Sequence, residues 1–185
     1  MDTGTQDSGT AGWPVAAGTT ALSVLLPEVD PLVRDWRGRY DTAARNGGSA
    51  HLTVLFPFLH RDRIRGPQRA ALAALYARHQ PFTVTFGRCG SFPGVLHLVP
   101  EPAAPLRALT AAAAARWPSH PPYGGLLGAV EPHVTVANSG GPRVHRRIAA
   151  QLAARLPVTA RVSRVELVVH EEGRWHPWLG FPLGG

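Results

Sequence analysis

The feature that most constrains this chain is a short pattern that occurs twice. The segment HLTV begins at His51, and the segment HVTV begins at His133, which is 133 − 51 = 82 positions later. Each segment consists of a histidine, an apolar residue, a threonine and a valine. Alternation of polar and apolar residues over such a stretch is typical of a half-buried β-strand. The same kind of strand in both halves of the chain predicts two related lobes rather than one regular parallel sheet.

The other predicted elements fit this two-lobed arrangement. Apolar or alternating runs predict strands at 21–27, 82–87 and 95–99 and a closing hairpin over 160–183 that turns near Glu172 and Gly173. Helical spacing predicts a helix that starts at Asp30 (N-cap) and Pro31 and ends before Asn46, and further helices within 67–79, 103–117 and 142–156. We therefore expect an α+β fold. Its antiparallel sheets, related by a pseudo-twofold, line a central cleft, and its helices pack outside.

The composition indicates one domain preceded by a polar tail. Residues 1–20 contain few large apolar groups and cannot offset the entropy cost of ordering, so we expect a disordered N-terminal tail and a single bilobal domain over 21–185. No apolar run reaches the roughly 18 residues that a membrane helix needs. Because the N-terminus lacks a basic region followed by an apolar block, and Cys89 is the only cysteine, we expect a cytoplasmic protein without an internal disulfide. We also expect a monomer without a membrane partner.

The charge of the chain is compatible with a phosphorylated partner. The formal net charge is +7, and all 19 basic residues are arginine. Arginine suits bidentate contact with phosphate, so a nucleic acid or a phosphorylated small molecule fits this balance. The arginines are scattered along the sequence rather than gathered in one block. Charge alone therefore does not identify the partner.

Each motif places a histidine and a threonine on one face of its strand. His51 and Thr53 share a face because side chains alternate along a strand, and His133 and Thr135 do the same. The Cα atoms within each pair lie about 7 Å apart. The hydroxyl can then donate to a non-bridging phosphate oxygen, while the imidazole reaches a bridging oxygen or a water. Two such pairs can grip one phosphate group.

Two histidines on opposite sides of one phosphorus atom suit an in-line displacement. One neutral imidazole takes a proton from the attacking oxygen, and one imidazolium gives a proton to the leaving oxygen. Histidine, with an unperturbed pKa of about 6.5, has both states accessible near neutral pH. We expect His51 and His133 to be the catalytic acid and base in an order left open, and Thr53 and Thr135 to bind the phosphate. This chemistry needs no metal ion or other cofactor.

With its paired His-x-Thr strands, HLTV and HVTV, the chain resembles the 2H phosphoesterase superfamily, which includes 2′-5′ RNA ligase-like proteins and 2′,3′-cyclic phosphodiesterases. The resemblance extends from Ala21 onward, because the order of strands and helices also fits the bilobal fold of that family. It implies that His51 and His133 are catalytic, that Thr53 and Thr135 hold the phosphate, and that no metal takes part. It also implies an RNA end or a nucleotide with a 2′,3′-cyclic phosphate as the substrate, and hydrolysis of that phosphate is the activity we expect.

Two further residues are candidates for substrate binding. Tyr123 lies in a Pro/Gly-rich loop that leads towards the second motif, where it could stack on a base or bond a phosphate. His97 lies on an alternating strand and could face the same cleft. Both residues also have an ordinary structural interpretation, as a packed loop residue and a surface histidine. His170 and His176 flank the last hairpin turn but lack a third ligand, so we expect no metal site.

Three alternative functions remain compatible with the sequence. A reversible 2′-5′ RNA ligase would use the same chemistry, with an RNA hydroxyl in place of water. A non-catalytic protein could use the two motifs to grip the phosphate of RNA or a nucleotide, with salt-dependent binding and no turnover. A purely structural protein would tolerate replacement of both threonines.

Overall fold

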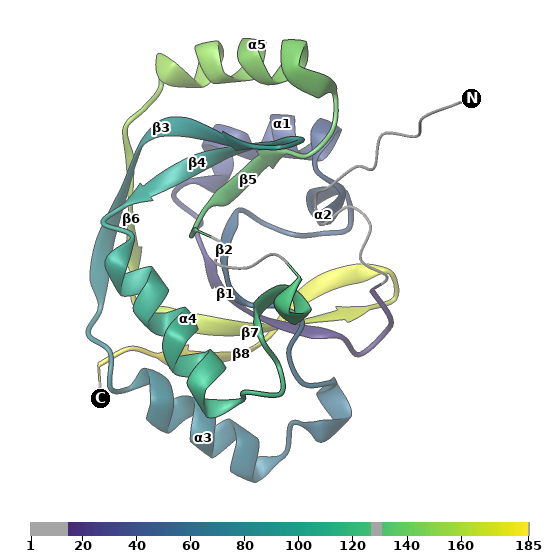
Figure 1. Ribbon diagram of the computed structural model, residues 1–185, viewed down its shortest axis with the longest axis vertical. Helices are drawn as coiled ribbons and strands as arrows, with labels where there is room; N and C mark the ends of the chain where they lie inside the picture. The colour runs from purple at the N-terminus through teal and green to yellow at the C-terminus, as the bar shows by residue number, and fades with distance from the viewer. Residues whose placement is uncertain (1–14, 127–130, 185) are drawn as a thin grey trace.

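Two four-stranded antiparallel sheets form the centre of the protein in the computed structural model, which describes residues 15–126 and 131–184 (Figure 1). The strand orders are β2-β1-β7-β8 in one sheet and β5-β4-β3-β6 in the other. The bounds are β1 Thr20–Leu25, β2 His51–Leu55, β3 Phe82–Phe92, β4 Val95–Glu101, β5 Val134–Ala137, β6 Val158–Val162, β7 Arg164–Glu171 and β8 Arg174–Pro182.

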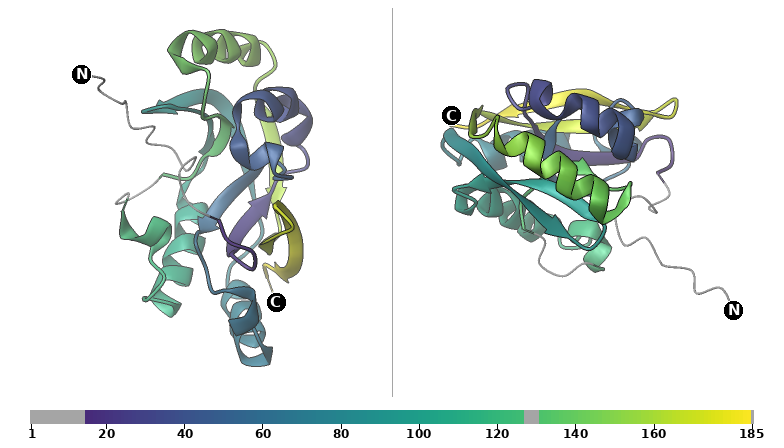
Figure 2. Two further views of the ribbon diagram at one scale, coloured as in Figure 1. Left: turned by 90° about the vertical axis from the view of Figure 1, so that its right-hand side faces the viewer. Right: turned by 90° about the horizontal axis from the view of Figure 1, so that it is seen from above.

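The helices cover the outside of the sheets. Helix α5 packs on β3 and helix α3 on β8, and Figure 1 places these two helices at opposite ends of the molecule. Seen from above, α1 and α5 lie side by side (Figure 2). The bounds are α1 Asp30–Tyr40, α2 Thr42–Arg45, α3 Gly66–Tyr76, α4 Ala104–Arg116 and α5 Gly141–Ala153, with 3₁₀ helices η2 Arg61–Arg63 and η3 Pro122–Gly125. No helix in the described ranges is both long enough and apolar enough to cross a membrane.

The two sheets repeat one arrangement around the motif strands. Each motif strand lies at the edge of its sheet, β2 beside β1 and β5 beside β4. Thr53 is opposite Ser23 in the first pair, and Thr135 is opposite His97 in the second. The predicted α+β class, with antiparallel sheets and helices outside them, is confirmed.

The apolar positions of both motifs lie in the hydrophobic core. Leu52 and Val54 of β2 and Val134 and Val136 of β5 are at most 3% exposed, and all four belong to one core cluster. A shift of one residue in either strand would turn these side chains to the other face. Burial of the apolar residues therefore fixes the direction in which the histidine and the threonine of each motif point.

The first predicted helix differs from the structure in two ways. Val29, not Asp30, occupies the N-cap position, and no side chain caps the helix there. The Asp30 carboxylate instead accepts a hydrogen bond from the amide of Ala50 at 2.8 Å, which joins α1 to the segment before β2. The helical stretch also breaks at Asp41, whose extended backbone ends α1 and whose side chain caps α2.

The predicted closing hairpin is only partly correct. Strands β7 and β8 do form a hairpin, and Glu172 and Gly173 at its turn have φ angles of 49° and 74°. Residues 158–162, however, form the separate strand β6, which pairs with β3 in the other sheet. Ser163 lies between β6 and β7, so the chain passes from one sheet to the other within a single residue.

The predicted division into a tail and a domain stays a prediction. Residues 1–14 of the predicted tail lie outside the described residues. Closer to the domain, the amide of Gly18 donates to the carbonyl of His170 at 2.8 Å, and Thr20 begins β1.

Candidate active site

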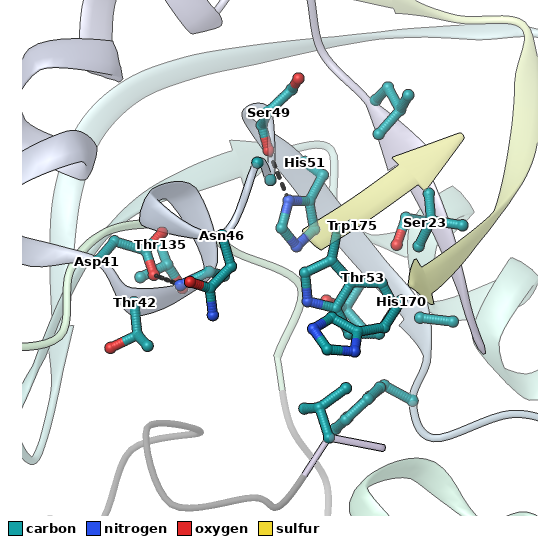
Figure 3. Close-up of a pocket in the computed structure, with 18 of the residues that line it drawn as sticks. Ser23, Asp41, Thr42, Asn46, Ser49, His51, Thr53, Thr135, His170 and Trp175 are labelled. Atoms are coloured by element: carbon teal, nitrogen blue, oxygen red, sulfur yellow. Dashed lines mark hydrogen bonds between the residues drawn. The ribbon is translucent and has the colours of Figure 1, made fainter. Parts of the chain in front are cut away.

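Both motifs face one cavity of about 410 Å³. His51 and Thr53 line it from β2, Thr135 lines it from β5, and His133 lines it from the position just before β5. Figure 3 shows His51, Thr53 and Thr135 around this cavity. The structure therefore brings together four residues that the sequence predicts as one site, although 82 positions separate the motifs.

Both motif histidines make the same hydrogen bond to the backbone. The Nδ1 atom of His51 lies 2.7 Å from the carbonyl oxygen of Ser49, and the Nδ1 atom of His133 lies 2.8 Å from that of Glu131. A carbonyl oxygen only accepts, so Nδ1 carries the proton in each ring. The neutral form of each imidazole then has an unprotonated Nε2, which can accept a proton from a ligand or a water.

The surroundings of the two imidazoles favour their neutral forms. Burial lowers the pKa of His51 to about 4, the positive charge of Arg37 and the proximity of His133 act in the same direction, and the Ser49 carbonyl opposes them. Burial also lowers the pKa of His133, against the opposing effect of the Glu131 carbonyl. Both rings are therefore mainly neutral in the free protein at pH 7.

One side of the cavity is polar. Thr42 and Asn46 lie with Thr135 on one side of His51 (Figure 3). Asn138, which is 4% exposed, also lines the cavity, and its Oδ1 atom has no hydrogen-bond partner. Its amide group donates to the Asp41 carboxylate at 3.2 Å. The polar groups on this side are those of Thr42, Asn46 and Thr135, whereas the Oδ1 atom of Asn138 is itself buried.

The other side of the cavity is aromatic. Phe56 packs edge-on against Tyr123 and Trp175, with ring centroids 6.3 and 6.1 Å apart. His170 packs against Trp175 at 5.3 Å, and Figure 3 places both residues on the opposite side of His51 from Thr42. These rings present apolar faces beside Thr53.

Tyr123, a predicted substrate-binding residue, lines the cavity, and hydrogen bonds fix both its side chain and its backbone. Its side chain hydrogen-bonds to Thr53, and its amide donates to the carbonyl of Phe56 at 2.6 Å. Its φ of 51° lies in the left-handed region, which is uncommon for a residue other than glycine and is found preferentially at functional sites. Its role in substrate binding stays a prediction.

His97, the other predicted substrate-binding residue, lies behind His133 rather than on the cavity wall. It faces the same side of the sheet as Thr135, and its ring lies 5.4 Å from that of His133 and stacks on Phe92 at 4.1 Å. Burial, together with nearby His133 and Arg88, lowers the pKa of His97 to about 4. These contacts fit a neutral ring that supports His133.

Several residues around the cavity were not among the predicted site residues. Arg37, Asp41 and Asn138 join the two motifs, and Trp175 and His170 form much of the aromatic side. One sequence signal was available for Arg37, because it falls on the same helical stripe as the apolar residues Val33 and Tyr40. No cluster of three or more metal-ligating side chains occurs within the described part of the chain.

A His-x-Thr strand lies at the edge of each sheet and both strands line one cavity, which is the arrangement that the two motifs predict for a phosphoesterase of the two-histidine type. The model of the 2′-5′ RNA ligase superfamily matches residues 25–174, and the chain belongs to this superfamily of 2H phosphoesterases. The resemblance inferred from the two motifs is thereby confirmed. No curated protein matches the sequence.

Solved structures share the fold at low sequence identity. The crystal structure of E. coli LigT complexed with NADP+ is 19% identical, with a TM-score of 0.57 over 91% of this chain and 99% of LigT. That of E. coli LigT complexed with 3′-AMP is also 19% identical, with a TM-score of 0.55 over 92% of this chain and all (100%) of LigT. The protein TT0787 of Thermus thermophilus is 21% identical, with a TM-score of 0.58 over 90% of this chain and 98% of TT0787.

Proposed function

We propose that this protein is a metal-independent phosphoesterase that hydrolyses 2′,3′-cyclic phosphates at the ends of RNA or on nucleotides. The observation that carries the proposal is the convergence of both His-x-Thr pairs on one cavity. His51 and His133 act as the general base and the general acid, and Thr53 and Thr135 hold the non-bridging oxygens. Membership of the 2′-5′ RNA ligase superfamily supports the choice of an enzyme over a binding protein.

The reaction needs one proton acceptor and one proton donor. The neutral histidine takes a proton from water as the water oxygen bonds to phosphorus. The bond between phosphorus and one ribose oxygen breaks, and the protonated histidine gives its proton to that oxygen. The product is a phosphate monoester beside a free hydroxyl. The threonine hydroxyls donate to the oxygens on which negative charge develops.

The aromatic side of the cavity supports a nucleotide as the substrate. Phe56, Tyr123 and Trp175 offer ring faces and edges next to Thr53, and stacking of a base on an aromatic side chain is worth about 1–3 kcal/mol. E. coli LigT, which shares the fold, has been crystallised with the nucleotides 3′-AMP, ATP and NADP+. A base on this side would place its ribose phosphate between the two histidines.

The polar side of the cavity favours a second candidate, 2′-5′ ligation. There Thr42 and Asn46 line the cavity away from the aromatic rings. Threonine and asparagine side chains can exchange hydrogen bonds with a sugar hydroxyl. An RNA end bound on this side could supply its hydroxyl in place of water.

Product analysis tests the proposal and separates the two candidates. We expect the purified protein to convert 2′,3′-cyclic nucleotides to monophosphates in the presence of EDTA. With cyclic-phosphate-ended RNA and a second RNA that has a free 5′-hydroxyl, hydrolysis gives a phosphate monoester end, whereas ligation gives a longer strand. Salt-dependent binding of these RNAs without any turnover would contradict both enzymatic candidates and favour a phosphate-binding protein.

The pH dependence should show an optimum on the acidic side of the ordinary histidine range. Activity is lost below the lower pKa, where the base is protonated, and above the higher pKa, where the acid is neutral. The pKa of His51 is lowered to about 4 and that of His133 is lowered as well. We therefore expect a bell-shaped profile of kcat/KM with its maximum below the ordinary histidine pKa of about 6.5. A maximum above about pH 7, measured at constant ionic strength with folding checked at each pH, would contradict this assignment.

A further inference from the structure

Arg37 is a fully buried arginine that contacts the backbone of the second motif and of the segment just before the first motif. It lies on α1, which packs against β5 (Figure 1), and it is 1% exposed. Its Nη1 atom donates to the carbonyl oxygen of Thr135 at 2.6 Å. Its Nη2 atom donates to those of Gly48 and Ser49, just before β2, at 3.1 and 3.2 Å. One guanidinium group thus joins the chain leading into the first motif to the middle of the second.

The Ser49 carbonyl connects this arginine directly to the first histidine. The same oxygen accepts the Nδ1 proton of His51 at 2.7 Å and the Arg37 hydrogen bond at 3.2 Å. A displacement of Arg37 would therefore move the group that orients the His51 ring and fixes its tautomer. The hydrogen bond that one ring nitrogen of a histidine makes determines whether the other nitrogen is free to face a ligand.

Asp41 completes the connection between the two segments. Its Oδ2 atom lies 2.9 Å from Nη1 of Arg37, and both side chains are almost fully buried. Its other oxygen accepts from the side chain of Asn138, the residue that follows β5. The backbone amide of Asn138 in turn donates to the carbonyl of Tyr40 at the end of α1. The end of α1 is therefore bound to β5 through both backbone and side chains.

No ladder of strand hydrogen bonds performs this task among the described residues. The strands β2 and β5 are edge strands of different sheets, so pairing within either sheet does not set the distance between them. An in-line reaction depends on that distance, because a misplacement of about 1 Å can cost about 10²-fold in rate. The contacts of Arg37 span this gap.

We propose that Arg37 is a positioning residue, which fixes the relative placement of the two His-x-Thr segments and orients His51 through the Ser49 carbonyl. The inference rests on the proposed function for its effect on turnover. Its geometrical part, the coupling of Arg37 to His51, is independent of the substrate.

The charge of Arg37 supplies a readout that a purely structural residue would not give. Asp41 and Asp30 act on Arg37 itself. His133, just before β5, acts on His51. His170 and His176 line the same cavity from β7 and β8. Burial is the largest cause of the lowered pKa of His51, and the Arg37 charge is the second. Loss of the charge should therefore raise the pKa of His51, which nevertheless stays below its ordinary value.

The test compares R37M and R37K with R39M, a matched control on the same helix. Arg39 is exposed and lines a separate pocket between α1 and α5, which contains no residue of either motif among those the structure describes. Titration of the His51 ring by NMR should show a higher pKa in R37M and the parental pKa in R37K and R39M. Turnover of a 2′,3′-cyclic nucleotide, corrected for the folded fraction, should fall about 10²-fold in R37M. A fall of about 10-fold is expected in R37K, because lysine cannot reproduce the fork of donors.

The outcomes separate the positioning role from the proposed activity. If R37M does not fold, R37K carries the test, and parental kcat/KM in R37K would overturn the positioning role. In folded R37M, an unchanged His51 pKa together with unchanged kcat/KM would overturn it as well. If the parent protein turns over none of the substrates, the proposed function fails. In that case the NMR titration of the His51 pKa tests by itself whether Arg37 is coupled to His51.

Discussion

Replacement of His51 or His133 by alanine is expected to remove nearly all turnover of a 2′,3′-cyclic nucleotide. General acid or base catalysis by a positioned side chain contributes about 10²–10⁴-fold, so each single variant should lose kcat/KM by that factor. In the proposed mechanism both rings act on one phosphorus atom, so the double variant should lose much less than the product of the two single losses. Steady-state kinetics with all variants at one pH measures the three factors.

Two controls make this prediction specific. His145→Ala changes a histidine on α5 that bonds the carbonyl of Ser139 and lies outside the cavity, so its kcat/KM should equal that of the parent. Circular dichroism should show that H51A and H133A keep the fold, because neither ring belongs to the hydrophobic core. If the double variant hydrolyses the substrate as fast as the parent protein, paired-histidine catalysis is wrong.

The sequence was sufficient to predict the residues of the two motifs and the fold around them. In both strands the apolar residues at alternate positions had to enter the core, and they are buried, as Leu52 and Val134 show. That single requirement fixes the direction of His51 and His133. The fold class followed from the order of short strands and helices, which depends on local patterns.

The residues that join the motifs could not be predicted in the same way. The partners of Arg37 are backbone carbonyls, including that of Thr135, which lies 98 positions away in the chain. Only the packing of α1 against β5 brings these groups together. Asp30 illustrates the same difficulty, because the sequence indicated a local N-cap, whereas its carboxylate makes a tertiary contact with Ala50.

The cavity's aromatic side and strand β6 were missed for a different reason. Trp175 and His170 reach the cavity because the β7-β8 hairpin lies beside β1 in the sheet, which is a matter of strand order rather than of local pattern. Strand β6 is separated from β7 by Ser163 alone, so the sequence offered no turn signal between them. Local periodicity identifies strands but does not assign them to sheets.

The second large effect we expect is on stability, in the variant Asp41→Ala. Asp41 is 2% exposed, and its removal leaves the buried Arg37 guanidinium without its ion-pair partner, although the charge of Asp30 still acts on it. Loss of one partner of a buried pair costs about 3–5 kcal/mol. The variant also loses the cap that Asp41 provides for the amide of Ala43. Denaturation with urea should show a lower midpoint with an unchanged m-value.

The expected loss in the free energy of unfolding of D41A arises because one buried charge is left unpaired. It does not mean that the intact pair makes a net contribution to stability of the same size. Burial raises the pKa of Asp41 although Arg37 opposes it, which means that the carboxylate is not ideally accommodated. The double variant R37M/D41A leaves no unpaired charge, so it should be less destabilised than the sum of the two single variants. Asp62→Ala serves as the control, because Asp62 is exposed and should change the free energy of unfolding by less than about 0.5 kcal/mol. A loss below about 1 kcal/mol in D41A would mean that water reaches this pair, and the buried connection between the two motifs would then be wrong.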